Sequence, residues 1–309
     1  MLKAESPISG EVMSKKLGVS RNAIWKQVNN LRDLEYEITA ETNVGYSLTK
    51  IPDYLWPFEL WPYLKTNDFG QQSFRGYELS STNAKAKELA RKKAEEGTIV
   101  LAESQSKGRG RRGRAWQSEP TKGIYLSLIL RPSRPLAEAS PYTFLGAYGV
   151  LRVCQDLGLK PVVKWPNDIY VQGKKISGVL AELSAIGQDI GYIVLGIGLN
   201  VNQSEFAPDI PGTSLSLELG RELSRVDVLA NLLYHLEIGY EKLKTDTEWL
   251  VELMRQNSLL LGKEVIVTGG IELEGIAEDI AEDGALLVRT KEGIVKVWAG
   301  DVSVREKRV

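Results

Sequence analysis

The residues with the clearest chemical potential form one short basic segment. Residues 107 to 114 read Lys-Gly-Arg-Gly-Arg-Arg-Gly-Arg. Glycine destabilises a helix by about 1 kcal/mol relative to alanine, and the segment has no apolar face for a strand, so it is predicted to be an exposed, mobile loop. Glycine amides approach anions closely, and arginine donates paired hydrogen bonds to carboxylate and phosphate oxygens. In isolation such a run is more typical of a solvated basic loop or a nucleic-acid tail than of a ligand site.

The sequence on either side of this segment favours a lid over an anionic ligand. Thr98 to Ala102 is an apolar stretch that predicts a strand. After Trp116, residues 123 to 130 read Gly-Ile-Tyr-Leu-Ser-Leu-Ile-Leu, which predicts a second strand with one buried face. A basic glycine loop between two strands is held at both ends, unlike a tail.

A second charged group is predicted on a strand, a turn and a hairpin. Residues 162 to 165 form a strand that enters the turn Pro-Asn-Asp at 166 to 168, and residues 175 to 183 form the second strand of the following hairpin. Alternation along that strand places Lys175 and Ser177 on one face and Ile176 and Gly178 on the other. A glycine within a strand indicates close approach by a ligand or by other backbone.

Two further motifs have a structural and a functional interpretation. The run Ser-Ser-Thr-Asn at 80 to 83 opens a helix predicted to reach Glu96 and to be closed by Gly97, and its hydroxyls could simply cap that helix. Residues 190 to 198 predict an apolar strand that ends in Gly-Ile-Gly-Leu-Asn at 196 to 200. Those glycines indicate either backbone amides at a site or a packing corner.

Together these residues suit the activation of a carboxylic acid by ATP. Attack of a carboxylate on the α-phosphate brings several negative charges together, so catalysis depends on positioning and on cations, and Lys164, Lys175 and the arginines supply them. No Gly-x-x-x-x-Gly-Lys-Ser/Thr motif is present, which argues against a P-loop enzyme. The residues therefore indicate an adenylate-forming ligase or a binder of an anionic ligand.

The composition excludes several other classes. The 309 residues carry a formal net charge of −1, so no global attraction to nucleic acid or membrane is expected. The chain has one cysteine, Cys154, and one histidine, His235, and both fall in predicted helices. With only one residue of each kind, disulfides, the common zinc clusters and a Ser-His relay elsewhere in the chain are excluded. No apolar run is long enough to span a bilayer, and the first residues do not form a signal peptide. The protein is expected to be cytoplasmic.

The first 50 residues predict a winged helix-turn-helix. Residues 9 to 17 and 21 to 34 have helical patterns, and residues 36 to 38 and 45 to 48 can pair as a hairpin. Only eight residues precede Ser9, so the first helix of the motif is expected to be truncated, through a misplaced start or a trimmed, less stable domain. A helical hairpin for protein contacts is the alternative. The residues predicted to contact DNA are Ser20, Arg21, Asn22, Trp25 and Lys26.

The rest of the chain predicts a linker, a larger domain and a small β-domain. Residues 51 to 70 have no clear period and are expected to be a linker, residues 71 to 259 a catalytic domain, and residues 260 to 309 a small barrel. Helices are predicted at 141 to 157, with Ser140 as N-cap, at 225 to 243 and at 247 to 257. The barrel strands are predicted at 264 to 268, 271 to 278, 284 to 290 and 293 to 298.

The motifs occur in the order found in the biotin protein ligase family, which the chain resembles over nearly its whole length. They are Ser81-Thr82-Asn83, Gln105, the Gly/Arg loop with Trp116, Lys164-Trp165-Pro166-Asn167-Asp168, Lys175-Ile176-Ser177-Gly178 and Gly196-Ile197-Gly198-Leu199-Asn200. With the domain in front, the chain resembles the bifunctional bacterial type, ligase and biotin-operon repressor. The resemblance implies an α+β fold: a winged helix-turn-helix, a central mixed sheet with helices, similar to class II synthetases, and a C-terminal SH3-like barrel.

The resemblance also implies roles for individual residues. Biotin would be bound by Ser81, Thr82, Asn83, Gln105, Arg109, Gly110, Arg111, Lys175 and Gly178. ATP would be bound by Arg111, Trp116, Lys164, Asn167, Lys175 and Asn200, and catalysis would depend on Lys175, Arg111, Lys164 and Asp168. Mg²⁺ would be required, although no residue is assigned as a metal ligand.

The reaction implied by the resemblance has two steps. Biotin and Mg-ATP give biotinyl-5′-AMP, and a lysine of the biotin carboxyl carrier protein, a subunit of acetyl-CoA carboxylase or of another biotin-dependent carboxylase, then takes the biotin. The adenylate would also act as corepressor by promoting a homodimer through the central sheet, and so binding to operator DNA. A lipoate or octanoate ligase, a biotin-sensing repressor without ligase activity, and a ligase whose regulatory domain has lost its function remain alternatives.

Overall fold

The computed structural model describes residues 1–207, 211–300 and 302–307. The chain divides into two compact units, Met1–Tyr54 and Leu55–Val309. Each unit is described by itself below. No helix of the described residues is long and apolar enough to cross a membrane.

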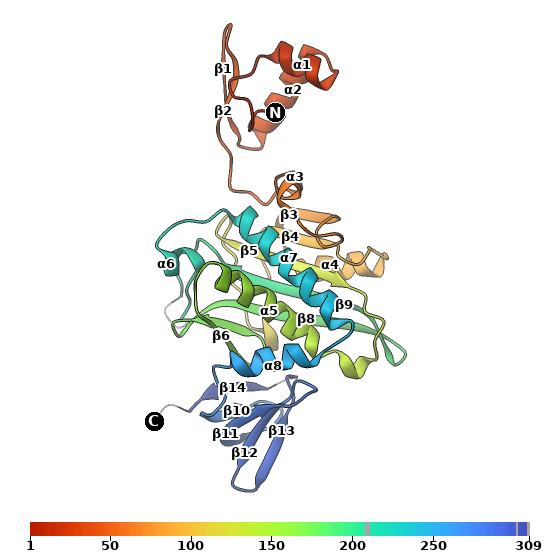
Figure 1. Cartoon of the computed structure of the whole chain (residues 1–309), viewed down its shortest axis with the longest axis vertical. Coiled ribbons are helices and arrows are strands. Elements are labelled where there is room, and N and C mark those ends of the chain that lie inside the picture. Colours follow the sequence, from red (N-terminus) through yellow and green to blue (C-terminus); the bar gives the residue numbers. More distant parts are fainter. Residues whose placement is uncertain (208–210, 301, 308–309) are drawn as a thin grey trace. The chain divides into compact units, whose positions relative to one another are not determined.

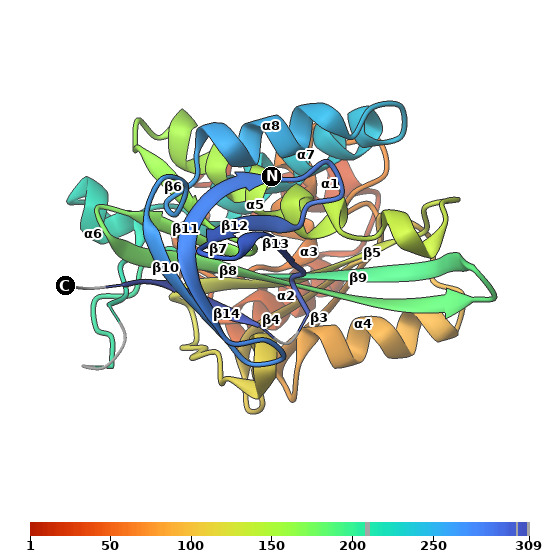
Figure 2. The ribbon, with the colours of Figure 1, turned by 90° about the horizontal axis from the view of Figure 1, so that it is seen from below.

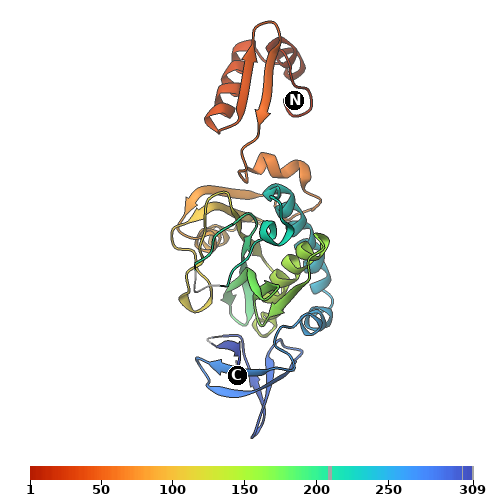
Figure 3. The same ribbon diagram turned by 90° about the vertical axis from the view of Figure 1, so that its left-hand side faces the viewer.

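The N-terminal unit has the order helix, turn, helix, hairpin that the sequence predicts (Figure 3). Helix α1 is Gly10–Leu17 and helix α2 is Arg21–Asp33, followed by the antiparallel strands β1, Glu37–Glu41, and β2, Gly45–Lys50. Ser9 and Ser20 cap the two helices by accepting hydrogen bonds from the amides of Val12 and Ala23. The segment before Ser9 is not helical, and Ile8 instead forms a bridge with Tyr46 of the hairpin.

The larger unit is built on a mixed seven-stranded sheet (Figure 1). Its strand order is β3-β4-β5-β9-β8-β7-β6, with β3 parallel to β4 and all other neighbours antiparallel. The bounds are β3 Ser73–Leu79, β4 Ile99–Gln105, β5 Gly123–Leu130, β6 Pro161–Lys164, β7 Asp168–Val171, β8 Lys174–Ile186 and β9 Asp189–Asn200.

Helices cover both faces of this sheet (Figure 2). Helix α4, Thr82–Arg91, packs on one face, and α5, Pro141–Asp156, and α7, Arg225–Leu243, pack on the other. The remaining short elements are α3 Pro57–Leu60, α6 Leu215–Leu219, α8 Glu248–Gln256 and 3₁₀ turns at Trp61–Tyr63, Arg111–Gly113 and Leu136–Glu138. Helix α5 is mostly apolar and mostly buried, and Cys154 is one of its buried residues, as predicted.

The C-terminal strands form a five-stranded antiparallel sheet in the order β13-β12-β11-β10-β14, which is the SH3-like arrangement. The strands are β10 Glu264–Thr268, β11 Leu273–Ile280, β12 Leu286–Thr290, β13 Gly293–Val297 and β14 Ser303–Glu306. The sequence predicts the first four but not β14. This strand is only four residues long, and its pairing with β10, which brings the two ends of the domain together, is a long-range contact.

Two predictions about helix ends are wrong. Helix α4 ends at Arg91, not at Glu96, because Lys93 adopts a left-handed conformation with φ 63° and the Arg131 guanidinium donates hydrogen bonds to the carbonyls of Ala90 and Ala94. Ser140 does not cap α5, because it is itself helical in backbone conformation and its side chain makes no capping bond. A 3₁₀ turn at Leu136–Glu138 precedes it, and Ala139 and Ser140 already have helical backbone angles.

The segment predicted as a linker packs into the larger unit from Leu55 onward. Leu55, Leu60 and Phe69 are at most 1% exposed and belong to the main core. The next turn is fixed by Glu237 of α7, whose carboxylate accepts hydrogen bonds from the amides of Asn67, Asp68 and Phe69 at 2.8, 2.8 and 2.9 Å. This carboxylate therefore fixes the chain where it enters β3.

We predict that Glu237→Gln lowers the free energy of unfolding by about 2 kcal/mol, because a neutral amide cannot accept all three backbone hydrogen bonds. Urea unfolding measures the change. Glu241→Gln, one turn further along α7, is the matched control, since Glu241 is exposed and contacts Lys244 at the surface. Equal losses in the two variants would contradict this role for Glu237.

Candidate active site

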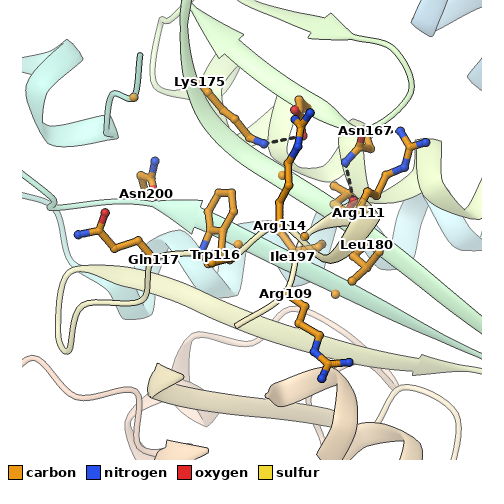
Figure 4. Close-up of a pocket in the computed structure, with 18 of the residues that line it drawn as sticks. Arg109, Arg111, Arg114, Trp116, Gln117, Asn167, Lys175, Leu180, Ile197 and Asn200 are labelled. Atoms are coloured by element: carbon orange, nitrogen blue, oxygen red, sulfur yellow. Dashed lines mark hydrogen bonds and ion pairs between the residues drawn. The ribbon is translucent and has the colours of Figure 1, made fainter. Parts of the chain in front are cut away.

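One cavity of about 650 Å³ lies on the face of the sheet that carries α4 (Figure 4). Its floor includes Gly178 of β8 with Gly196 and Gly198 of β9, and its walls come from the start of α4, the basic loop and the turn after β6. Its lining includes every residue assigned to ligand binding or catalysis from the sequence: Ser81, Thr82, Asn83, Gln105, Arg109, Gly110, Arg111, Trp116, Lys164, Asn167, Asp168, Lys175, Gly178 and Asn200. Residues more than 100 positions apart thus share one site.

The glycines of the floor make room for particular side chains. A Cβ atom on Gly198 would lie 2.4 Å from the Trp116 ring, and one on Gly196 would lie 2.2 Å from Asn83 Oδ1. These distances are far below van der Waals contact, so both positions require glycine. The packing interpretation of these glycines is therefore confirmed, and the functional one stays a prediction: the side chains that they admit line the cavity.

A β-bulge brings Lys175 into the cavity. The register of β7 against β8 pairs Asp168 with Gly178 and Tyr170 with Lys175, and it shifts between Ile169 and Tyr170. The extra residue in β8 places Lys175 on the same side as Gly178, so the alternation predicted from the sequence is wrong here. Ile176 and Ser177 are both fully buried instead.

Uncharged polar groups gather at the end of the cavity formed by α4. The Thr82 amide and hydroxyl donate hydrogen bonds to Gln105 Oε1 at 2.8 and 3.1 Å, and Gln105 Nε2 donates to Ser118 Oγ at 3.1 Å. Ser81 caps α4, so the structural interpretation of the hydroxyl run also holds. The apolar residues Leu126, Val179, Leu180 and Ile197 line the cavity as well.

Cations gather around the turn after β6. Lys175 Nζ forms an ion pair with Asp168 Oδ1 at 2.7 Å and lies 5.3 Å above the Trp116 ring (Figure 4). Burial lowers the pKa of Lys164 from its ordinary value, and the positive charges of Lys175 and Arg114 lower it further, although Asp168 opposes the shift. A lysine held in this way gains more from an anionic ligand than an exposed lysine does.

The basic loop is folded more tightly than the sequence predicts. The Trp116 amide donates to the Gly108 carbonyl at 3.0 Å, and the Gly110 amide donates to the Arg114 carbonyl at 2.7 Å, which closes a small hairpin. Gly108 is buried at its base, while the tip at residues 112 to 114 is exposed as expected. The loop therefore covers the cavity with its base and presents its tip to solvent.

Arg111 joins this loop to the C-terminal domain. Its guanidinium donates hydrogen bonds to Asn167 Oδ1 at 3.1 Å, to the carbonyls of Gly300 and Val302 at 2.8 and 3.2 Å, and to the Ala299 carbonyl. Val302 and the residues at 303 and 304 also line the cavity. No local sequence signal indicates this contribution, because it depends on a contact across about 190 residues.

Comparison with known proteins assigns a family to this arrangement. Residues 75–200 match the model of the biotin/lipoate A/B protein ligase family, residues 1–47 match a helix-turn-helix domain, and residues 260–305 match the biotin protein ligase C-terminal domain. The bifunctional ligase/repressor BirA of Bacillus subtilis (strain 168) is 37% identical over 304 residues, which cover 96% of this chain and 94% of that protein. The chain belongs to the biotin protein ligase family. The resemblance predicted from the motifs is confirmed.

Other ligases agree with this assignment. The bifunctional ligase/repressor BirA of Escherichia coli (strain K12) is 30% identical over 96% of this chain and 92% of its own length. The structure of a biotin protein ligase from Aquifex aeolicus in complex with biotin and ATP superimposes with a TM-score of 0.68 and 32% identity, over 77% of this chain and all of that one. The protein is thus a ligase that carries a repressor-type domain in front of its catalytic domain.

Lys164 allows a test of the electrostatics of the ligase site. Its lowered pKa means that, below this pKa, the folded state carries the full cost of a partly desolvated charge, which disappears as the pH rises towards the ordinary value of 10.5. We predict that Lys164→Met unfolds at a higher urea concentration than wild type at neutral pH, and that the gain shrinks as the pH approaches 10.5.

Lys160→Met is the control for this experiment, because Lys160 is exposed just before β6. It should leave the urea midpoint nearly unchanged at every pH. A loss of stability in Lys164→Met at neutral pH would contradict the electrostatic description of the site.

Proposed function

We propose that the cavity joins biotin to ATP and then transfers biotin to a lysine of the biotin carboxyl carrier protein. The observation that carries this proposal is the division of one cavity into two chemically different ends. Uncharged donors and acceptors lie around Thr82 and Gln105, and Arg111, Lys164 and Lys175 supply positive charge elsewhere in the lining. A ligand with a neutral polar ring at one end and a carboxylate at the other matches this arrangement.

At the neutral end, the ureido ring of biotin would contact Thr82 and Gln105, with Ser81 and Asn83 beside them. The Leu180 side chain and the backbone of the sheet at Gly196 and Gly198 would border the sulfur ring and the aliphatic chain. Gly178 would allow the aliphatic chain of biotin to pass close to the sheet, and Arg109, Gly110 and Arg111 would cover this part of the ligand. The carboxylate would then point towards Lys175.

At the cationic end, a carboxylate oxygen of biotin attacks the α-phosphorus of ATP. An oxygen–phosphorus bond forms, and pyrophosphate leaves with the electron pair of the bond that breaks. Lys175, held by Asp168 at 2.7 Å, and Lys164 stabilise the negative charge that gathers at the phosphate. Trp116, Asn167 and Asn200 would contact the nucleotide. In the second step the amine of an acceptor lysine attacks the acyl carbon, and AMP leaves.

The magnesium ion is proposed to enter as part of Mg-ATP. Among the described residues, no group of three or more histidine, cysteine, aspartate or glutamate side chains is placed to hold a metal ion. Phosphate oxygens would supply most of its ligands, as is usual for nucleotide-bound magnesium. The protein residues here act on the same phosphates through positive charge.

The N-terminal unit is proposed to bind operator DNA through the start of α2. Arg21, Asn22, Trp25 and Lys26 are exposed there, with Trp25 at 59%, and Ser20 caps the helix beside them. We propose that the adenylate acts as corepressor by favouring a homodimer. We also propose the following division of the chain: residues 1 to 50 are the DNA-binding domain, 51 to 70 the linker, 71 to 259 the catalytic domain and 260 to 309 the barrel.

Biotin-dependent exchange of labelled pyrophosphate into ATP tests the first step directly. We expect exchange with biotin and none with lipoate. Exchange with lipoate alone would replace this proposal with a lipoate ligase. No exchange with either acid would indicate a ligand-sensing repressor without ligase activity.

We predict that Arg111→Gly releases the adenylate about ten to a hundred times faster than wild type, because a charged hydrogen-bond donor at the lid is lost. Dissociation of labelled biotinyl-AMP measures this rate. Arg112→Gly is the matched control, because Arg112 is exposed and its φ of 57° is one that glycine adopts easily. Equal dissociation rates for Arg111→Gly and wild type would exclude this role.

A further inference from the structure

A chain of hydrogen bonds runs behind the neutral end of the cavity. It begins at Glu182 of β8, passes through Asn83 of α4 and Ser127 of β5, and ends at Thr82. Neither Glu182 nor Ser127 has a role in the reaction proposed above, and Ser127 is fully buried. Glu182 follows Gly178 and Leu180 at alternate positions of β8, so it lies on the cavity side of the sheet.

The first part of this chain fixes the orientation of the Asn83 amide. Asn83 Nδ2 donates to Glu182 Oε2 at 2.8 Å and to the Leu180 carbonyl at 3.3 Å. If the amide were turned over, Oδ1 would face a carboxylate and a carbonyl oxygen, and no hydrogen would lie between them. Asn83 is 6% exposed, so such a repulsion would be poorly screened. Only one orientation of the amide is therefore compatible with Glu182.

Glu182 is charged in this arrangement. Burial by itself would raise the pKa of its carboxyl group, but the hydrogen bonds from Lys87 and Asn83, together with the positive charges of Lys87 and Arg109, hold the pKa below its ordinary value. Lys87 Nζ lies 2.7 Å from Glu182 Oε1 at the rim of the site. The fixed orientation therefore begins at an anchored negative charge.

The orientation of Asn83 then determines what Ser127 does. Asn83 Oδ1 faces Ser127 Oγ at 2.6 Å, and Ser127 also contacts Thr82 Oγ1 at 2.8 Å. Asn83 Oδ1 has no hydrogen, so Ser127 is the donor, and its single hydroxyl hydrogen is shared between Asn83 Oδ1 and Thr82 Oγ1. With the amide reversed, Asn83 would donate to Ser127, and the hydroxyl would be free to point elsewhere.

The result at the cavity surface is a defined pattern of donors and acceptors. The hydroxyl hydrogen of Thr82 is directed to Gln105 Oε1, so Thr82 Oγ1 meets a ligand only as an acceptor. Gln105 Oε1 is occupied by Thr82, and Gln105 Nε2 uses one hydrogen on Ser118, which leaves one hydrogen for a ligand. An acceptor and a donor thus stand side by side, as a cyclic urea requires for its N–H and C=O groups.

We propose that Glu182 and Ser127 are positioning residues that hold Thr82 as a hydrogen-bond acceptor through Asn83, and so determine specificity for a ureido N–H. This inference rests on the proposed function, because it assigns the neutral end of the cavity to the biotin ring. It concerns the discrimination between ligands of the same shape, which contact area alone cannot supply.

Binding of isosteric ligands tests the inference. Isothermal titration calorimetry is performed on the full chain with biotin and with the two cyclic carbamate analogues in which one ureido N–H is replaced by oxygen. Wild type should prefer biotin over at least one carbamate. We predict that Ser127→Ala and Glu182→Gln each reduce this preference about tenfold, mainly by weakening the binding of biotin. Glu88→Gln, which alters an exposed ion pair on the same helix, should leave the preference unchanged.

Two outcomes would overturn the inference. One is an unchanged preference in both variants, and the other is an equal loss of affinity for biotin and carbamate, which is the mark of a merely structural role. Glu182→Gln keeps the size of the side chain, so it serves if Ser127→Ala fails to fold. Failure of the proposed function is distinguishable, because wild type itself would then show no biotin-dependent pyrophosphate exchange.

Discussion

The absence of side chains at three positions of the sheet is the constraint on which the site depends. Gly178, Gly196 and Gly198 leave the centre of the sheet bare on the face that carries α4, and Trp116 and Asn83 occupy the space next to the backbone. With larger residues there, the basic loop and the start of α4 could not approach the sheet so closely. The opposite face is filled by α5 and α7 and carries most of the apolar core. Stability and function are thus separated onto the two faces of one sheet.

The distribution of charge follows from the same architecture. The net charge of the chain is only −1, so the attraction for anionic ligands must arise locally. Lys164, Lys175 and Arg111 come from a strand end, a bulge and a loop that meet at one place. Positive charge held in this way destabilises the folded protein when no anion is bound, as the lowered pKa of Lys164 indicates, and an anionic ligand would offset that destabilisation. The ion pair of Lys175 with Asp168 keeps one of these cations in place before a ligand arrives.

Glycine, proline and charge patterns are local signals, and they were sufficient for the order of the elements and for the basic loop, Lys164 and Lys175. The other residues that meet in the cavity were predicted from the resemblance to the biotin protein ligase family. The local signals failed where geometry depends on distant partners. The bulge at Ile176 places Lys175 on the face of the sheet opposite to the one predicted. Hydrogen bonds from Arg131 help to end α4 at Arg91, five residues before the predicted end at Glu96. Strand β14 and the contact of Arg111 with the C-terminal domain likewise have no local signature. Glu182 could have been found, since it continues the alternation that begins at Gly178.

The most direct test of the two-ended cavity is a crystal structure of the protein with a non-hydrolysable analogue of biotinyl-5′-AMP. We predict the ureido ring beside Thr82 and Gln105, the phosphate isostere beside Arg111, Lys164 and Lys175, and the aliphatic chain passing over Gly178. A ligand bound in the reverse direction, or outside this cavity, would contradict the account of how the fold performs the ligase reaction.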